Sequence, residues 1–462
     1  MSPVALLAAG TWLAFGGFII FTIQWLCRPT ILVKLPGPSG GNWLYGHVLK
    51  LMGAKGLEYQ THLFSKHGPT TVIKGFLGTD MICTIDPAII HTVQIKDKEK
   101  FRRAEGPTIM LRAVLGGGLL ALPPDEHRVQ RKMPIFMSIA KEATTTIDKE
   151  LAPSKGSKEV DVFPWATAAA LDLVGEAGLG YAFNSFSGER NEYSTAIKGV
   201  TQSFGKTGPF VELLPYVHRL GTPAFRQRVM DLIPSGTLQH LRHVVGLQQG
   251  QAEEIIRSRE ALLAAGNDLS TQAGRGRDIM TLLMKANESA GSESYIDRET
   301  MIGHMNVFIF AGHETTSTAV SRVLEVLAHR SNVQVRLREE LRQYFEANPD
   351  ETHHDGLLEL PYLDGIVREV LRLYPPVAAI SRICNEDAVL PLDFPINTPS
   401  GKITSIPIKK GARIMMSNAL FNRNKAIWGE RADEFLPERW IGSKLGEVTQ
   451  PGSRLPGVYS SM

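Results

Sequence analysis

Ala311-Gly312-His313-Glu314-Thr315-Thr316-Ser317 lies within the longest helical pattern of the chain, which runs from Asp297 to His329. The residues before this stretch are apolar nearly all round, so we expect a buried helix. A glycine inside a helix costs about 1 kcal/mol, and adjacent hydroxyls can bond back to the backbone and bend it. An acid beside a hydroxyl in a locally opened helix could hold water and pass protons. The alternative is a kinked core helix whose hydroxyl groups form hydrogen bonds only within the same helix.

A second pattern places Glu369 and Arg372 three residues apart, on one face of the helix expected over Tyr362–Tyr374. Two prolines, Pro375 and Pro376, follow and end that helix. The same Glu-x-x-Arg spacing also begins at three other positions, where solvated surface pairs are the simplest interpretation: Glu99, Glu254 and Glu339.

The remaining pattern is mostly helical, with two strand-like regions from about Thr70 to Ile85 and from Ala388 to Arg413. The sequence therefore predicts a mainly α fold with a small β portion, and no linker divides it. The other expected helices are Asp161–Leu179, Gln239–Ala264, Asp278–Ala286 and Val333–Phe345.

Three stretches of the sequence resemble motifs of the cytochrome P450 family and occur in the family's order. The resemblance covers nearly the whole chain. Residues 311–316 resemble its I-helix signature A/G-G-x-D/E-T-T/S, residues 368–376 its K helix, and Pro437-Glu438-Arg439-Trp440 its later P-E-R segment. The resemblance implies the cytochrome P450 fold. It also implies monooxygenation, in which one atom of O2 enters an apolar organic substrate and the other leaves as water.

Roles for individual residues follow from the same resemblance. Glu314 and Thr315 would deliver protons during oxygen activation, and Ala311 and Gly312 would leave room for oxygen. A structural, charge-neutralising triad would consist of Glu369, Arg372 and Arg439.

The implied cofactor is haem b, whose two carboxylates need cationic donors. His127 and Arg131 match the His-x-x-x-Arg of the family's C-helix region, and Arg382 matches a further propionate contact. Arg128 stays an alternative, because a Trp-x-x-x-Arg pattern would pair it with Pro124. A basic solvated helix face is the other interpretation of this stretch.

In this family a Cys thiolate within F-x-x-G-x-R-x-C-x-G ligates the haem iron. The three cysteines, Cys27, Cys83 and Cys384, lack this context and precede Pro437. We therefore expect a C-terminally incomplete domain that ends before the cysteine loop, with no metal ligand in this chain. The alternative function is a truncated, catalytically inactive, membrane-anchored protein without thiolate-ligated haem.

Residues 1–27 contain no charged side chain, and the apolar run Val4–Leu26 would span roughly 30–35 Å as a helix. Arg28 and Lys34 follow it, which predicts a cytoplasmic body by the positive-inside rule. A signal peptide is the less favoured alternative, since no basic residue precedes the run. The expected organisation is a transmembrane anchor (1–27), a Pro/Gly hinge (28–41) and one domain (42–462) at the endoplasmic reticulum membrane.

The composition limits the classes of partner that this protein is expected to bind. A net charge of +3 does not suggest nucleic acid, and an odd number of cysteines does not suggest a disulfide framework. The resemblance to anchored microsomal members implies an NADPH-cytochrome P450 reductase, O2 and membrane lipid as partners. The tail resembles fungal members, which suggests secondary metabolism. The substrate would be an apolar small molecule of terpenoid, steroid-like, fatty or aromatic class.

Overall fold

The computed structural model describes residues 31, 33–115, 135–152, 158–186, 203, 206–207, 211–265, 280–281, 283–284, 287, 295–349, 356–398, 401–442 and 449. Four predictions fall outside these residues: the haem contacts at His127 and Arg131, Cys27 and the anchor at 1–27. Within the described part, the chain forms two compact units. The first consists of Met1–Ala104 and Ala379–Phe421, and the second of Glu105–Ala378 and Asn422–Ser453.

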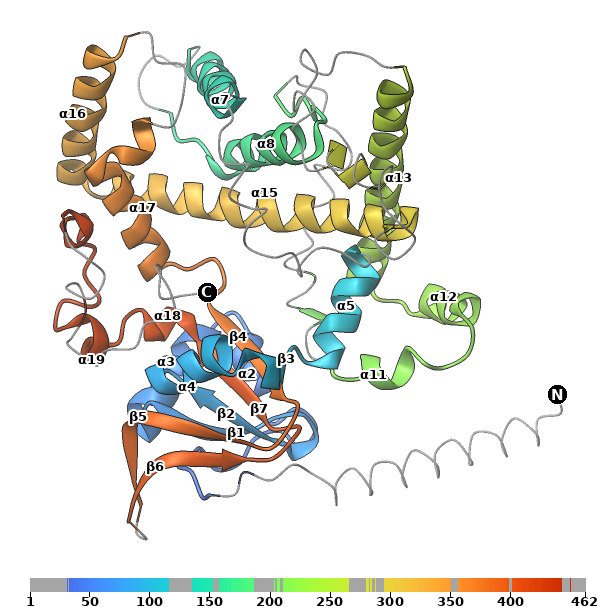
Figure 1. Cartoon of the computed structure of the whole chain (residues 1–462), viewed down its shortest axis with the longest axis vertical. Coiled ribbons are helices and arrows are strands. Elements are labelled where there is room, and N and C mark those ends of the chain that lie inside the picture. Colours follow the sequence, from blue (N-terminus) through green and yellow to red (C-terminus); the bar gives the residue numbers. More distant parts are fainter. Residues whose placement is uncertain are drawn as a thin grey trace. The chain divides into compact units, whose positions relative to one another are not determined.

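The second unit is helical and is organised around α15 (Arg298–Ala328). α8 (Phe163–Val174) lies along its middle, α13 (Gly236–Ala264) packs near one end, and α16 (Ser331–Ala347) and α17 (Pro361–Leu373) near the other (Figure 1). The other elements of this unit are α5 (Glu105–Leu115), α7 (Ile135–Leu151), η5 (Gly175–Leu179), α11 (Leu214–Val217), α12 (Pro223–Leu232), η9 (Gly356–Glu359), α19 (Lys425–Trp428) and η10 (Pro437–Trp440).

Local sequence explains where the long helices begin. Asp297 caps α15, because its carboxylate accepts a hydrogen bond from the Thr300 amide at 2.9 Å. Ser235 caps α13 by accepting from the amide of Leu238. The core of the unit forms where α13 and α15 bury their apolar faces together with residues such as Leu171 and Leu179.

The first unit contains a five-stranded sheet in the order β1-β2-β7-β4-β3. β2 and β7 are parallel, with Ile82 opposite Ile414, and the other neighbours are antiparallel. The strands are β1 (Thr70–Lys74), β2 (Asp80–Thr84), β3 (Phe101–Arg102), β4 (Ala379–Cys384) and β7 (Arg413–Ser417).

A separate two-stranded sheet pairs β5 (Ala388–Thr398) with β6 (Gly401–Ile408) in the same unit. Asp86 ties it to α4 (Pro87–His91), since its carboxylate accepts from the amides of Ala88, Asp393 and Phe394. The short elements of the unit are α2 (Val48–Met52), α3 (Gly56–His67), η1 (Phe76–Gly78), η2 (Thr92–Lys96), η3 (Lys98–Lys100) and α18 (Asn418–Phe421).

The segment expected to be a hinge is bonded to the sheet in its described part. The carbonyl of Pro36 accepts from the Val72 amide at 2.9 Å and from the Thr71 hydroxyl at 2.6 Å. A Cβ on Gly37 would lie 2.0 Å from the Val72 carbonyl oxygen, so only glycine allows this approach. Residues 35–37 therefore follow β1 closely.

The fold class predicted from the sequence, mainly α with a small β portion, is confirmed. The helix expected over Asp297–His329 is present, and so are the two strand regions. Arg382 and Cys384 lie in strand β4, which is outside the two strand-like regions that the sequence indicated. Among the described residues, none of the helices has both the length and the apolar character needed to cross a bilayer.

Candidate functional site

The middle of α15 carries the motif 311–317 as part of one continuous helix. Local opening of the helix, expected from its glycine and hydroxyls, is therefore absent from the backbone. The Thr315 hydroxyl instead donates to the Ala311 carbonyl at 2.7 Å, one turn earlier. This bond satisfies the hydroxyl hydrogen and leaves its oxygen free to accept.

One face of α15 is exposed in the middle of the helix. Ala311 and Thr315 are exposed, whereas Met305 and Ile309, less than two turns earlier, are buried in the core. Residues four apart share a helix face, so a small side chain and a hydroxyl lie together on an accessible strip. Glu314 borders this strip, and its side chain is 22% exposed.

Gly312 lies on a different face of the same turn, against α8. A Cβ at this position would lie 2.6 Å from Cγ2 of Val174, closer than real carbon contacts. The close packing of the two helices therefore explains why this residue has no side chain. The role predicted for Gly312, leaving room for oxygen, is therefore not needed to explain why position 312 is a glycine.

His313 is completely buried, on the side of the helix that faces away from the exposed strip. Its Nδ1 bonds to the Ile309 carbonyl oxygen at 2.7 Å, and its Nε2 lies 3.6 Å from Oε2 of Glu314. Burial lowers the pKa of His313, an effect that the Ile309 bond and the Glu314 charge only partly oppose. Sequence reasoning passed over this residue, because the family signature leaves its position open.

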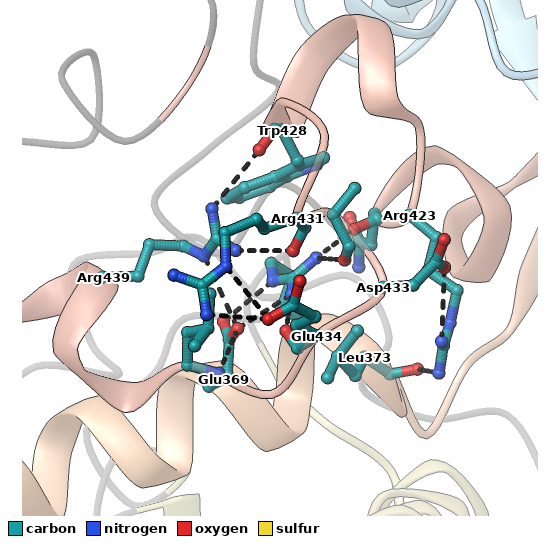
Figure 2. A network of polar contacts seen from close by, with 12 residues as sticks. Glu369, Leu373, Arg423, Trp428, Arg431, Asp433, Glu434 and Arg439 are labelled. Atoms are coloured by element: carbon teal, nitrogen blue, oxygen red, sulfur yellow. Dashed lines mark hydrogen bonds and ion pairs between the residues drawn. The ribbon is translucent and has the colours of Figure 1, made fainter.

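α17 and the chain around η10 form the second cluster, which is centred on the carboxylate of Glu369 (Figure 2). Arg372 donates two hydrogen bonds to this carboxylate, both at 2.8 Å, and the two side chains are at most 1% exposed. Nε of Arg439 lies 3.5 Å from Oε1 of Glu369. The structure thus brings together the three residues that the sequence suggested as a triad.

The cluster also includes donors and acceptors that the sequence did not indicate. The indole N–H of Trp440 and the amide of Leu436 each donate to Glu369 at 3.0 Å. Arg372 donates its other N–H groups to the carbonyls of Asn422 (2.6 Å), Ala432 (2.7 Å) and Glu434 (3.1 Å). No sequence signal could have identified backbone acceptors some 50 to 60 residues away.

Arg439 is shared between the carboxylate and the backbone. It donates to the carbonyls of Trp428 at 3.3 Å and Arg431 at 3.0 Å (Figure 2). Burial lowers the pKa of its guanidinium group, and the charge of Glu369 opposes that effect. The arrangement holds the loop from residue 422 to 440 against α17 and is structural, since it offers no free acid or base.

Arg382, the predicted propionate contact of the first unit, projects from β4. Its guanidinium donates to the neighbouring Ser381 carbonyl at 2.9 Å. Burial lowers the pKa of Arg382, and the positive charge of Arg103 lowers it further. Two arginines whose charges repel each other would be stabilised by an anion, so this site fits a carboxylate ligand.

The described residues fit haem in part. Taken by itself, the exposed Ala311–Thr315 strip of the second unit suits a flat ring, and Arg382 of the first unit suits a carboxylate. The described cysteines do not suit the iron: Cys83 and Cys384 are buried, burial raises both pKa values, and Sγ of Cys384 donates to the Glu386 carbonyl. No axial thiolate is therefore available in the described part, and we derive no chemical step through the iron.

Comparison with known proteins agrees with these motifs. The family model for cytochrome P450 matches residues 35–456. Cytochrome P450 monooxygenase 91 of Postia placenta is 35% identical over 469 residues, covering 96% of this chain and 86% of the relative. Ganoderic acid synthetase CYP5150L8 of Ganoderma lucidum is 30% identical over 467 residues, covering 95% and 84%. Haem is the cofactor of this family, and this chain belongs to the cytochrome P450 family.

Proposed function

We propose that this protein is a haem-dependent monooxygenase that inserts one oxygen atom of O2 into an apolar organic substrate. The observation that supports this function best is the exposed strip of α15, where Ala311 and Thr315 adjoin the partly exposed Glu314. The relatives named as monooxygenases support the same reaction class.

Bound haem would supply the activation of dioxygen, and side chains of α15 would transfer the protons that this reaction consumes. The carboxyl group of Glu314 can carry a proton from water to the strip. The Thr315 oxygen retains lone pairs beside its hydrogen bond to Ala311, so it can accept a hydrogen bond from the water or carboxyl group that carries the proton. Arg382, with His127 and Arg131, would hold the haem carboxylates.

The setting that we propose is the endoplasmic reticulum membrane, with residues 1–27 as a single transmembrane anchor and the body in the cytoplasm. The uncharged run followed by Arg28 and Lys34 supports this orientation. Electrons would come from an NADPH-cytochrome P450 reductase. The relative named as a ganoderic acid synthetase supports a role in secondary metabolism.

A second function is a non-catalytic, membrane-anchored protein without thiolate-ligated haem. It is favoured by the burial of Cys83 and Cys384, the two cysteines in the described part of the chain. Sequencing the 3′ end of the transcript separates the two functions. A frame that continues into F-x-x-G-x-R-x-C supports the monooxygenase, and a stop codon directly after Met462 supports the alternative.

The translated product of that transcript gives the matching biochemical test. Reduction under carbon monoxide should produce a thiolate-type spectrum if the cysteine loop is encoded. For the 462-residue chain we expect no such spectrum. Its appearance would show that another cysteine reaches the iron.

The proton-delivery role is tested by Thr315→Ala in the haem-loaded product that includes the cysteine loop, together with its reductase. A panel of terpenoid, steroid, fatty and aromatic compounds first identifies one that stimulates NADPH oxidation. In the variant, NADPH oxidation should continue while product falls and peroxide per NADPH rises, by about tenfold or more. Thr316→Ala removes an exposed hydroxyl about 100° away around the helix and is the matched control. Equal coupling in the Thr315 variant and the wild type would refute the assignment.

A further inference from the structure

The contact between His313 and Glu314 on α15 has a function that the family signature does not assign. We propose that His313 is a positioning residue that shares one proton with Glu314 and so keeps the pair protonated between transfers. This inference rests on the proposed function, in which Glu314 delivers protons to the exposed strip.

Hydrogen bonding determines the tautomer of the imidazole. The Ile309 carbonyl can only accept, so Nδ1 of His313, at 2.7 Å, must carry the hydrogen. In the neutral ring, Nε2 then has a lone pair and acts as an acceptor. The buried Nε2 has no hydrogen-bond partner among the described residues, and the nearest polar atom recorded for it is Oε2 of Glu314 at 3.6 Å.

Two acceptors that face each other in a buried place are unfavourable. If Glu314 were ionised and His313 neutral, a carboxylate oxygen would face a lone pair with no hydrogen between them. One proton removes the conflict, whether on the carboxyl group or on Nε2. The separation of 3.6 Å suits an ion pair, which would need a charged ring, but complete burial favours the neutral ring. Either position places the shared proton between Nε2 of His313 and Oε2 of Glu314.

Charged groups on the neighbouring helices do not replace this partner. Asp172 of α8 accepts from Ser185, and Glu369 of α17 is paired with Arg372. The charge that acts on His313 comes from Glu314. Other titratable groups on the packed elements are Glu176 after α8, Arg259 of α13, His304 of α15, Glu105 of α5 and Arg336 of α16.

The proton balance is simple. Glu314 releases its proton toward the strip, which leaves a carboxylate beside the Nε2 lone pair. Since this state is disfavoured, the pair takes up a proton from water through the partly exposed carboxyl group. The ring is not consumed. It promotes re-protonation and orients the carboxyl group.

The test is a pH titration of the full chain in detergent, labelled with 15N-histidine. The chain contains 13 histidines, and His313→Gln identifies the signal by its loss. Long-range 1H–15N spectra should show Nδ1 protonated and Nε2 as an acceptor. Over the pH range in which the fold is stable, the Nε2 shift should change in one step as the pair loses its proton. His304→Gln, which removes another histidine of α15, should leave this step unchanged.

The Glu314→Gln variant tests whether the pH-dependent step of His313 requires the carboxyl group of Glu314. The amide would donate to Nε2 at every pH, so the step should vanish while the Nδ1 signal stays. The same step in this variant would overturn the proposal. So would a ring protonated on Nε2 only, or no step in the wild type over that range.

A second readout separates this inference from the proposed function. In the haem-loaded enzyme, His313→Gln should raise peroxide per NADPH about threefold at high pH and leave it unchanged at low pH, where solvent protons are abundant. A shared proton in the spectra with no change in coupling would leave the pair intact and refute proton delivery. A coupling change without the spectral step would refute the shared proton.

Discussion

The carboxylate of Glu369 shows how much a single residue organises in this protein. It accepts hydrogen bonds from Arg372, Leu436 and Trp440 and lies next to Arg439. The Glu369 side chain itself is completely buried. A buried charge is tolerated only when its partners are complete. The residue therefore connects α17 to the loop from 422 to 440.

Replacing Glu369 by Ala should leave Arg372 as an uncompensated buried cation and lower the free energy of unfolding by about 3–5 kcal/mol. The result should be loss of a stable fold, and hence of haem binding. Urea unfolding of the purified chain checks this. Glu339→Ala, in an exposed Glu-x-x-Arg pair of α16, is the control and should change stability by less than about 0.5 kcal/mol. Similar stability in both variants would contradict the structural role.

His47 of the first unit makes a pH-dependent contribution. Its Nε2 donates to the Gly40 carbonyl at 3.0 Å, and its Nδ1 is hydrogen-bonded to the Tyr59 hydroxyl at 2.7 Å. Burial lowers the pKa of His47 in the folded state. The folded chain then binds fewer protons than the unfolded chain between that lowered pKa and about 6.5, so stability rises with pH in this window.

We therefore expect the contribution of His47 to be complete above about pH 6.5 and to be lost as the pH falls below it. Unfolding midpoints measured across this range should decrease with acid in the wild type and decrease less in His47→Gln. Parallel curves for the two proteins would show that another group controls the acid sensitivity.

At the scale of elements, the contact of α15 with α8 depends on the absence of one side chain. Gly312 faces Val174, whose branched side chain has little rotational freedom in a helix. Alanine would favour the helix by about 1 kcal/mol, but its Cβ would overlap with Cγ2 of Val174. Packing and helix propensity therefore act in opposite directions at this position.

Gly312→Ala should thus lower the free energy of unfolding by about 1–3 kcal/mol in the wild-type background. In a Val174→Ala background the overlap is gone, and the same change should stabilise the chain by up to about 1 kcal/mol. The double-mutant cycle, measured by urea unfolding, gives the coupling of the two residues. Additive effects would mean that the helices do not approach closely here.

At the scale of the whole molecule, both compact units are discontinuous in sequence. The first unit is completed by Ala379–Phe421, after the chain has built most of the second. Because the two exchange chain segments without a Pro- or Gly-rich linker between them, the sequence indicated one body. The membrane attachment that we propose would, by contrast, depend on one local segment, residues 1–27.

Residues 1–27 should hold the full chain in the membrane fraction after carbonate washing. Phe15→Lys places a charge near the centre of the apolar run, at a cost of about 3 kcal/mol for insertion, and should release part of the chain. Phe15→Leu keeps the position apolar and is the control. Equal retention of all three proteins would exclude this segment as the anchor.

The sequence by itself predicted the long helix α15, the helices α13, α16 and α17 and the strands β1, β2, β5 and β6, and it indicated the family, because periodicity and short motifs are local. It did not predict strand β4. It also singled out the Glu369 pair among four similar spacings, through the prolines that follow. Only the tertiary structure decided that Trp440 donates to Glu369, that Gly312 makes room for Val174 and that His313 turns Nε2 toward Glu314. These features depend on burial and on contacts between distant parts of the chain or between side chains of fixed orientation. A pattern of residue types does not contain that information, because hydrogen-bond direction and close packing arise only when the elements meet.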